Sequence, residues 1–273
     1  METGAITGYI DVAQVVLYAF WVFFAGLILY LRKEDKREGF PLESERSAYI
    51  DVIGFPRPPE PKTFLLADGQ SVTVPRAEPP RQLAAEPYLP FLGAPLEPTG
   101  DPMVDGVGPA SFALRSDVPD RTVEGENRIL PLRALPDYGL EPRDPDPRGL
   151  PVVGADGESG GSVVDVWVDR ADPLVRYFEV EVDVPGGEQN GAAADPDAAG
   201  SKATRRTLVP VNFAHVEKSR ARVMVKAVLG EHFARAPGLA SPDQVTLLEE
   251  DRISAYFGGG LLYATPQRAE PLI

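Results

Sequence analysis

The sequence predicts a single N-terminal transmembrane α-helix followed by a mainly-β domain, a small antiparallel barrel, with a helix at its C-terminal end. Three observations predict this architecture. An uninterrupted apolar run covers residues 12–31, 20 of the 29 prolines lie between Pro41 and Pro147, and short segments of alternating apolar and polar residues follow residue 149. A length of 273 residues is enough for one membrane span and one domain of ordinary size.

Composition excludes several classes of protein. The chain carries 27 Lys and Arg against 41 Asp and Glu, a formal charge of −14, so we expect no nucleic-acid partner, because phosphate binding needs a cationic surface. The absence of cysteine excludes a disulfide framework, a thiolate nucleophile and Cys-ligated metal centres. The two histidines, His215 and His232, lie in different expected elements, and we expect no metal site.

Residues 12–31 form the expected membrane helix. They read VAQVVLYAFWVFFAGLILYL, with no charged side chain between Asp11 and Arg32. About 20 residues at ~1.5 Å rise cross the ~30 Å hydrocarbon core of a bilayer, and a helix satisfies every backbone polar group there. A cleaved signal peptide is the alternative, but such a peptide carries basic residues before its apolar run, whereas Glu2 and Asp11 precede this one.

Basic residues after the helix predict its orientation. They are Arg32, Lys33, Lys36 and Arg37. By the positive-inside rule they place the C-terminal side in the cytoplasm, with residues 1–11 as a periplasmic tail. We expect these four side chains, with Tyr30 as an aromatic anchor, to lie at the membrane interface and contact lipid.

Residues 32–148 are expected to form a Pro-rich, extended segment along the membrane surface. Proline fixes φ and lacks an amide donor, which excludes long helices and central strands. Large apolar residues such as Phe55 and Phe64 are interleaved with the prolines, so we expect the segment to bind a partner, with a flexible spacer as the alternative. Residues 62–66 and 71–74 predict a hairpin around Asp68-Gly69.

Residues 149–240 are expected to form the barrel. Alternating runs at residues 162–169 (SVVDVWVD) and 177–184 (YFEVEVDV), with shorter runs at 150–153, 207–211 and 222–228, predict about five short strands. Residues 185–205 contain no aromatic residue and predict a flexible loop.

Residues 241–273 are expected to form a C-terminal helix and tail. Thr246 followed by Glu249 is typical of a capping box at a helix start. The triplet Gly258-Gly259-Gly260 disfavours an isolated helix. It therefore indicates either close packing against a neighbour or an early end of the helix.

Catalytic motifs are missing from the sequence. It contains no G-x-S-x-G, H-E-x-x-H or P-loop pattern, so we do not predict an enzyme, and a membrane-tethered hydrolase lacks a nucleophile beside a base. Asp165, Asp169 and Asp172 are close in sequence. They could carry protons or hold a cation, or they could form a solvated strand face and turn.

Several stretches, taken together, resemble the H subunit of the photosynthetic reaction centre of purple bacteria. The longest are PTGDPMVDGVGPAS at residues 98–111 and VTLLEEDRISAYFGGGLLYATP at 245–266. Shorter ones lie at residues 18–31, 37–43, 61–65, 149–153 and 163–169. This resemblance implies that the barrel is of the PRC type. An independent single-pass membrane adaptor, whose barrel binds a soluble partner, is the alternative.

The resemblance implies a role in light-driven electron transfer. The family's H subunit binds no pigment of its own and lies in the bacterial inner, intracytoplasmic photosynthetic membrane. It caps the L and M subunits, which hold bacteriochlorophyll, bacteriopheophytin, quinones, non-haem iron and carotenoid, and it assists proton delivery to the secondary quinone. Light-harvesting subunits surround the complex, and a cytochrome subunit is a further expected neighbour.

The resemblance also implies which residues conduct protons. Asp169, Asp172 and Arg176 match family positions in the region where protons reach the complex. Glu124 and Glu126 stand where some family members carry two histidines. Carboxylates pass protons but bind soft divalent metals less well than imidazole does, so we do not expect metal inhibition to transfer to this chain.

Overall fold

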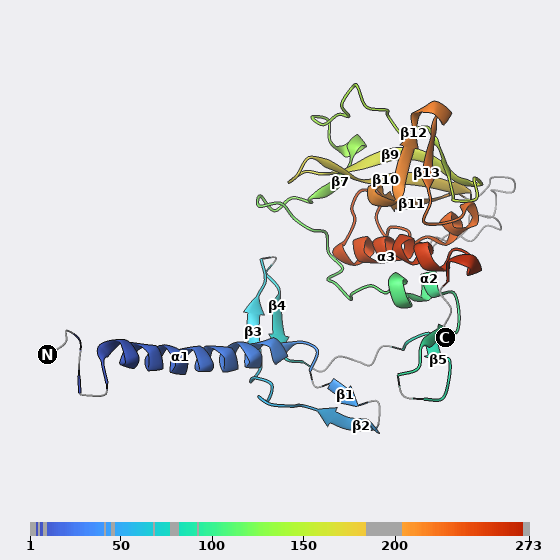
Figure 1. Cartoon of the computed structure of the whole chain (residues 1–273). Helices are drawn as coiled ribbons and strands as arrows, with labels where there is room; N and C mark the ends of the chain where they lie inside the picture. Colours follow the sequence, from blue (N-terminus) through green and yellow to red (C-terminus); the bar gives the residue numbers. More distant parts are fainter. Residues whose placement is uncertain are drawn as a thin grey trace. The chain divides into compact units, whose positions relative to one another are not determined.

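The computed structural model describes residues 4, 6–7, 10–40, 42–44, 47–67, 69–76, 82–91, 93–183 and 204–269 (Figure 1). The chain divides into two compact units: Met1–Gln82 with Phe91–Gly93, and Leu83–Pro90 with Ala94–Ile273. The boundary expected at residues 148 and 149 does not coincide with this division. The reason is that residues after 94 supply Met103 and Ile129 to the same hydrophobic core as the barrel.

The first unit begins with α1 (Val12–Glu34), which continues into the short 3-10 helix η1 (Asp35–Arg37). Asp11 caps α1, accepting from the Gln14 amide at 2.7 Å. Within the described part of the chain, this is the one helix whose length and composition suit a membrane span. None of its residues is buried. The predicted apolar helix is confirmed, and it extends three residues beyond Leu31 before the chain turns.

Two antiparallel strand pairs complete the first unit. β1 (Leu42–Ser44) pairs with β2 (Ser47–Val52), and β3 (Lys62–Leu65) pairs with β4 (Ser71–Val74). The second pair is the predicted hairpin, although Asp68 of its turn lies outside the described residues. The Thr63 and Thr73 hydroxyls lie 2.7 Å apart across it.

The second unit is built around a seven-stranded sheet (Figure 1). Strand order is β11-β10-β9-β8-β13-β12, with β7 also paired to β9. Only β8 and β13 run parallel among these described pairs. The strands are β7 (Ile129–Pro131), β8 (Pro151–Val153), β9 (Ser159–Asp169), β10 (Leu174–Asp183), β11 (Thr204–Pro210), β12 (Ala214–Glu217) and β13 (Arg222–Val225). The mainly-β prediction is therefore confirmed.

The second unit also contains several small elements. They are β5 (Ala85–Pro87), β6 (Leu96–Pro98), α2 (Pro102–Asp105) and the 3-10 helices η2 (Gly108–Ala110), η3 (Leu132–Ala134), η4 (Val211–Phe213), η5 (Lys218–Arg220), η6 (Gly230–Arg235) and η7 (Pro266–Arg268). Of the loop predicted at residues 185–205, residues 185–203 lie outside the described residues, whereas Thr204 and Arg205 belong to β11.

β9 is buried on both faces over its second half, which simple alternation did not predict. A register shift against β10 places Asp165 opposite Glu179 but Val163 opposite Val180. This irregularity lets Val163 and Val166 both enter the core, while Val164 is half-buried. Trp167, on the opposite face from Val166, is fully buried as well.

α3 (Leu247–Tyr263) packs against the sheet domain through its glycines. The predicted capping box is present, because the Thr246 hydroxyl accepts from the Glu249 amide and the Glu249 carboxylate accepts from the Thr246 amide. The glycine triplet does not end the helix. A Cβ on Gly259 would lie 2.5 Å from the Ala110 Cβ, and one on Gly260 would lie 2.5 Å from the Ala227 carbonyl oxygen. Close packing is therefore the correct alternative.

Candidate functional site

The turn from β9 to β10 and residues 120–128 lie side by side and bring four of the predicted proton-transfer residues together. Ile129 pairs with Asp169 across the sheet, and the Arg170 amide donates to the Arg128 carbonyl at 2.9 Å. Arg170 also forms an ion pair with Glu126 at 2.5 Å. The segment 120–128 carries Glu124 and Glu126, and the β9–β10 turn carries Asp169 and Asp172. These four carboxylates therefore form one charged cluster.

Asp169 is the buried member of this cluster, with 2% of its surface exposed. Its carboxylate accepts from Arg128 Nε at 2.9 and 3.0 Å and from the amides of Ala171 and Asp172. Burial alone would raise the pKa of Asp169, but the Arg128 guanidinium and the two amides outweigh it and hold the pKa below its usual value. The ionised side chain therefore fixes the turn and the position of Arg128.

The other three carboxylates lie at the surface. Glu124, Glu126 and Asp172 are exposed to solvent. The Thr122 hydroxyl and the Glu124 amide lower the pKa of Glu124. The three side chains concentrate acidic groups at one edge of the domain, which attracts protons and cations.

Arg176 lies close enough to another carboxyl group, that of Glu250, to affect its pKa. Glu250, in the first turn of α3, accepts a hydrogen bond from the Tyr177 hydroxyl at 2.8 Å. Burial raises the pKa of Glu250, and the Asp120 charge raises it further, whereas Tyr177 and Arg176 oppose the shift. A signal was present in the sequence: Glu250 precedes Ile253 and Phe257 by three and seven positions, on the buried face of the helix.

Asp120 connects the two groups of residues. Its carboxylate accepts from Arg128 Nη1 at 3.2 Å, and the neighbouring Val118 carbonyl accepts from the Leu247 amide at 3.0 Å, at the start of α3. The Asp120 charge also raises the pKa of the half-buried Glu250, so these residues form one electrostatically linked group between Glu250 and the surface carboxylates. We call it the Asp120 network, and its members are Asp120, Arg128, Asp169, Arg176, Tyr177 and Glu250.

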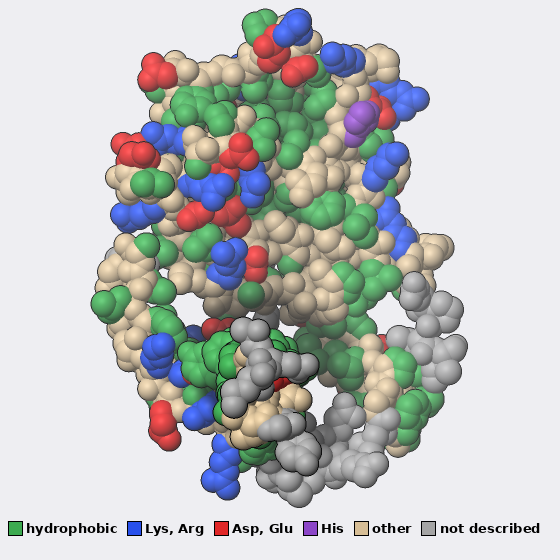
Figure 2. Space-filling model, turned by 60° about the vertical axis from the view of Figure 1, so that its left-hand side comes forward, with side chains coloured by type: hydrophobic (Ala, Val, Ile, Leu, Met, Phe, Trp, Pro, Cys, Tyr) green, Lys and Arg blue, Asp and Glu red, His purple; other side chains and the backbone are tan. Residues whose placement is uncertain are grey.

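Asp165 belongs to a separate, structural cluster. Arg133 Nη1 donates to Asp165 at 3.0 Å and to Glu179 at 2.5 Å, and Trp167 Nε1 donates to Glu179 at 3.0 Å. The ion pairs fasten η3 to β9 and β10. Figure 2 shows acidic and basic side chains next to one another at several places on the face it presents. Among the described residues, no group of three or more His, Cys, Asp or Glu is placed to hold a metal.

The residues predicted to lie at the membrane interface separate into two groups. Tyr30, Arg32 and Lys33 are exposed at the end of α1, as a lipid contact requires. Arg37 instead donates to the Glu34 carboxylate and to the carbonyl oxygens of Glu60 and Val74. Its guanidinium holds the β3–β4 hairpin to the helix end.

Lys36 differs most from the expectation of a lipid contact. Only 2% of its surface is exposed, and Nζ donates to the carbonyl oxygens of Ile53 at 2.9 Å and Pro56 at 2.6 Å. The ammonium also lies 5.0 Å from the centre of the Phe40 ring. Lys36 therefore stabilises the fold of this unit and does not contact a lipid headgroup, because residues 53–56 fold back over its side chain.

Two family models together match most of the chain. The model of the photosynthetic reaction centre H-chain N-terminal region matches residues 4–134, and the model of the PRC-barrel domain matches residues 141–231. The first match contains α1 together with Asp120 and Arg128 of the Asp120 network, and the second contains β8 to β13. The chain therefore belongs to the H-subunit family of the photosynthetic reaction centre, as a membrane-anchored structural subunit whose β domain is a PRC barrel.

Proposed function

We propose that this chain caps the L and M subunits of the reaction centre on the cytoplasmic side and assists proton delivery to the secondary quinone. In this proposal the L and M subunits hold the bacteriochlorophyll, bacteriopheophytin, quinones, non-haem iron and carotenoid, and light-harvesting subunits surround the complex. The basic residues after α1 support an orientation with the N-terminus in the periplasm. The match to the H-chain N-terminal region favours this role over that of an independent adaptor.

The raised pKa of Glu250 is the observation that carries the proton-delivery role. A carboxyl group exchanges protons most effectively when its pKa lies near the working pH. Burial and the Asp120 charge move the Glu250 pKa in that direction. Asp169, in contrast, is held ionised by Arg128, so its part is to position the network.

Tyr177 is suited to stay protonated beside Glu250. Burial, followed by the Glu250 charge, raises the pKa of the Tyr177 hydroxyl far above its usual value. The hydroxyl therefore donates to Glu250 when that carboxylate is ionised, and it can rotate to accept when Glu250 is protonated. Each protonation state of Glu250 then keeps a hydrogen bond, which lowers the cost of the exchange.

Flash-induced proton uptake in the complex purified from its native membrane tests this proposal. We expect Glu250→Gln to slow the proton uptake that follows the second electron transfer, and to leave primary charge separation intact. Glu141→Gln is the matched control, because Glu141 is an exposed glutamate paired with Arg143 outside the network. An unchanged uptake rate in Glu250→Gln would remove Glu250 from the pathway.

The assignment to a photochemical complex has its own test. Mild-detergent purification of the tagged chain should bring down pigment that absorbs in the near infrared and bleaches on a flash. An intact but colourless preparation would contradict the reaction-centre role and support the adaptor.

A further inference from the structure

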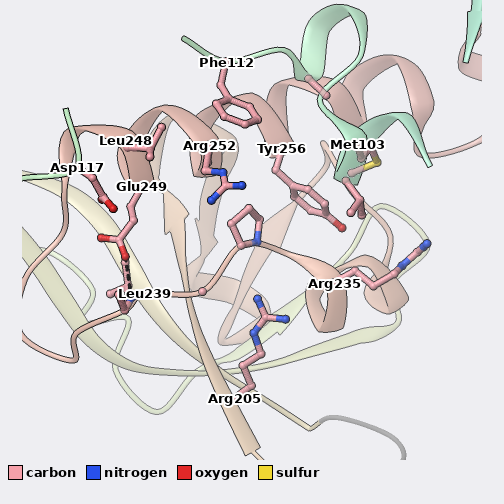
Figure 3. A pocket seen from close by; sticks show the side chains of 15 residues that line it. Met103, Phe112, Asp117, Arg205, Arg235, Leu239, Leu248, Glu249, Arg252 and Tyr256 are labelled. Atoms are coloured by element: carbon pink, nitrogen blue, oxygen red, sulfur yellow. Dashed lines mark hydrogen bonds between the residues drawn. The ribbon is translucent and has the colours of Figure 1, made fainter. Parts of the chain in front are cut away.

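A cavity of about 600 Å³ lies between α3, β11 and the segments around α2 and η6 (Figure 3). Leu248, Arg252 and Tyr256 line it from one face of α3, since they are spaced four residues apart. Met103 and Phe112 contribute apolar surface next to this helix (Figure 3). Its volume falls in the range of ~300–1,000 Å³ that is usual for small-molecule sites.

Arginine side chains converge on this cavity. Figure 3 shows the guanidinium groups of Arg205 and Arg252 entering from opposite sides, Arg205 from β11 and Arg252 from α3. Arg235 lies at one end, where it pairs with Asp101 at 2.6 Å. Converging guanidinium groups are typical of sites that bind oxyanions.

Arg205 lacks an anionic partner among the described residues. Its Nη1 donates to the Ala234 carbonyl at 3.0 Å, and its Nη2 donates to the Ala236 carbonyl. Its Nε is buried and has no hydrogen-bond partner within the described part of the chain. A half-buried cation held only by neutral groups is costly, and an incoming anion would offset that cost.

Arg252 is also available to a ligand. Its guanidinium carbon lies 5.1 Å from the centre of the Phe112 ring, a contact that leaves its N–H donors open to a ligand. The two carboxylates of the lining do not neutralise it. Glu249 accepts from the Ala240 and Thr246 amides, and Asp117 accepts from the Thr246 hydroxyl, at the other end of the cavity from Arg235 (Figure 3).

We propose that this cavity binds a phosphate-bearing amphiphile, with the phosphate between Arg205 and Arg252 and the apolar part against Met103, Phe112 and Leu248. Two guanidinium groups on opposite sides can contact different oxygens of one phosphate. The apolar wall would add affinity that a free inorganic anion cannot gain. This site is separate from the Asp120 network, so its test and the proton-uptake test succeed or fail independently.

Isothermal titration calorimetry of the full chain in neutral detergent tests the proposal. The probes are dihexanoyl phosphatidic acid, inorganic phosphate and dihexanoyl phosphatidylcholine, whose headgroup has no net charge. Arg252→Gln is the test variant, because Arg252 is exposed and its loss should not disturb folding. Arg143→Gln is the control, since it removes the same charge from an exposed arginine outside the cavity. Circular dichroism melting confirms that both variants fold.

We expect saturable binding of the phosphatidic acid at one site. Arg252→Gln should weaken this binding at least ~10-fold, because a hydrogen bond to a charged group is worth about a factor of ten or more in affinity. Arg143→Gln should leave the affinity unchanged. Phosphatidylcholine should bind more weakly than the phosphatidic acid. If inorganic phosphate bound with the same affinity as the phosphatidic acid, the proposal that the ligand is an amphiphile would be overturned. Absence of saturable binding, or equal binding by Arg252→Gln, would overturn the site.

Discussion

The Tyr177 hydroxyl donates to the Glu250 carboxylate at 2.8 Å and so joins β10 to the first turn of α3. The contact connects residues that lie 73 positions apart in the sequence. It places a carboxyl group with a raised pKa beside a donor that stays protonated.

Glu250→Gln should change how stability depends on pH. Because the folded-state pKa of Glu250 is raised above 4.5, the folded protein binds the proton more tightly than the unfolded chain does. The stability that Glu250 contributes through this tighter proton binding is therefore present below pH 4.5. It is lost as the pH rises through the folded-state pKa of Glu250. We expect wild type to lose stability relative to Glu250→Gln over that interval, as measured by chemical denaturation at several pH values. A constant difference would contradict the raised pKa.

Tyr177→Phe should shift the pH profile of proton uptake to higher pH. The Tyr177 hydrogen bond lowers the pKa of Glu250, so its removal raises that pKa further. The substitution should also cost about 1.5–3 kcal/mol of stability at neutral pH, the usual worth of a hydrogen bond to a charged group. Proton uptake in the intact complex, recorded as a function of pH, measures the first effect. A profile that does not move would show that Tyr177 acts only in packing.

Asp169→Asn should destabilise the β9–β10 turn by about 1.5–3 kcal/mol at neutral pH, because Arg128 loses a buried, charged acceptor. The pKa of Asp169 is held below 3.8 in the folded protein, so this stabilisation is present above pH 3.8 and is lost as the pH falls through the folded-state value. Urea denaturation at neutral and acidic pH tests both statements. Asp172→Asn is the control, with an expected change within about 0.5 kcal/mol, since its side chain is exposed.

Asp172→Asn should slow proton uptake without changing primary charge separation. Asp172, Glu124 and Glu126 are exposed carboxylates on two adjoining segments, and we expect them to collect protons in parallel. Loss of one should therefore remove about a third of the rate, and loss of all three should remove most of it. A pH-indicator dye after flash excitation reports the rate, with Glu141→Gln as reference. Full activity of the triple variant would place the collection of protons elsewhere.

Neighbouring glycines of α3 should respond in opposite ways to alanine. A Cβ on Gly259 would lie 2.5 Å from the Ala110 Cβ, whereas the nearest atom to a Cβ on Gly258 is the Pro109 carbonyl oxygen at 3.5 Å. We expect Gly259→Ala to cost about 1–3 kcal/mol through overpacking. Gly258→Ala should be neutral or stabilise by up to about 1 kcal/mol through helix propensity. The melting temperatures of both variants, compared with wild type, test this prediction. Equal changes in the two variants would contradict the packing described for η2 and α3.

Sequence patterns predicted the elements whose residues are long and regular enough to show a period. The apolar run of α1, the alternation in β9 and β10 and the Thr246–Glu249 capping box all correspond to local physical rules. β7 and β12, of three and four residues, were missed. β8 and β13 are as short, but they were predicted because apolar residues continue beyond their ends. The register shift in β9 depends on its partner strand, so no local pattern could reveal it.

The candidate site was predictable only in part. Resemblance to the family indicated Asp169 and Asp172, but the sequence could not show that Arg128 holds Asp169 ionised, since they lie 41 residues apart. Glu250 was not predicted as a site residue, although its spacing from Ile253 and Phe257 was an available clue. For Lys36, proximity to the membrane helix suggested a lipid contact. Its burial depends on how residues 53–56 fold back.

The position of Lys36 has a mechanical consequence for the membrane anchor. Its ammonium is attached to the carbonyl oxygens of Ile53 and Pro56, and the adjacent Arg37 is attached to those of Glu60 and Val74. Rotation of α1 about its own axis would therefore turn these four backbone points with it. Rotation of the helix is therefore coupled to the loops that follow it, and a torque on α1 is transmitted to the β3–β4 hairpin through Arg37.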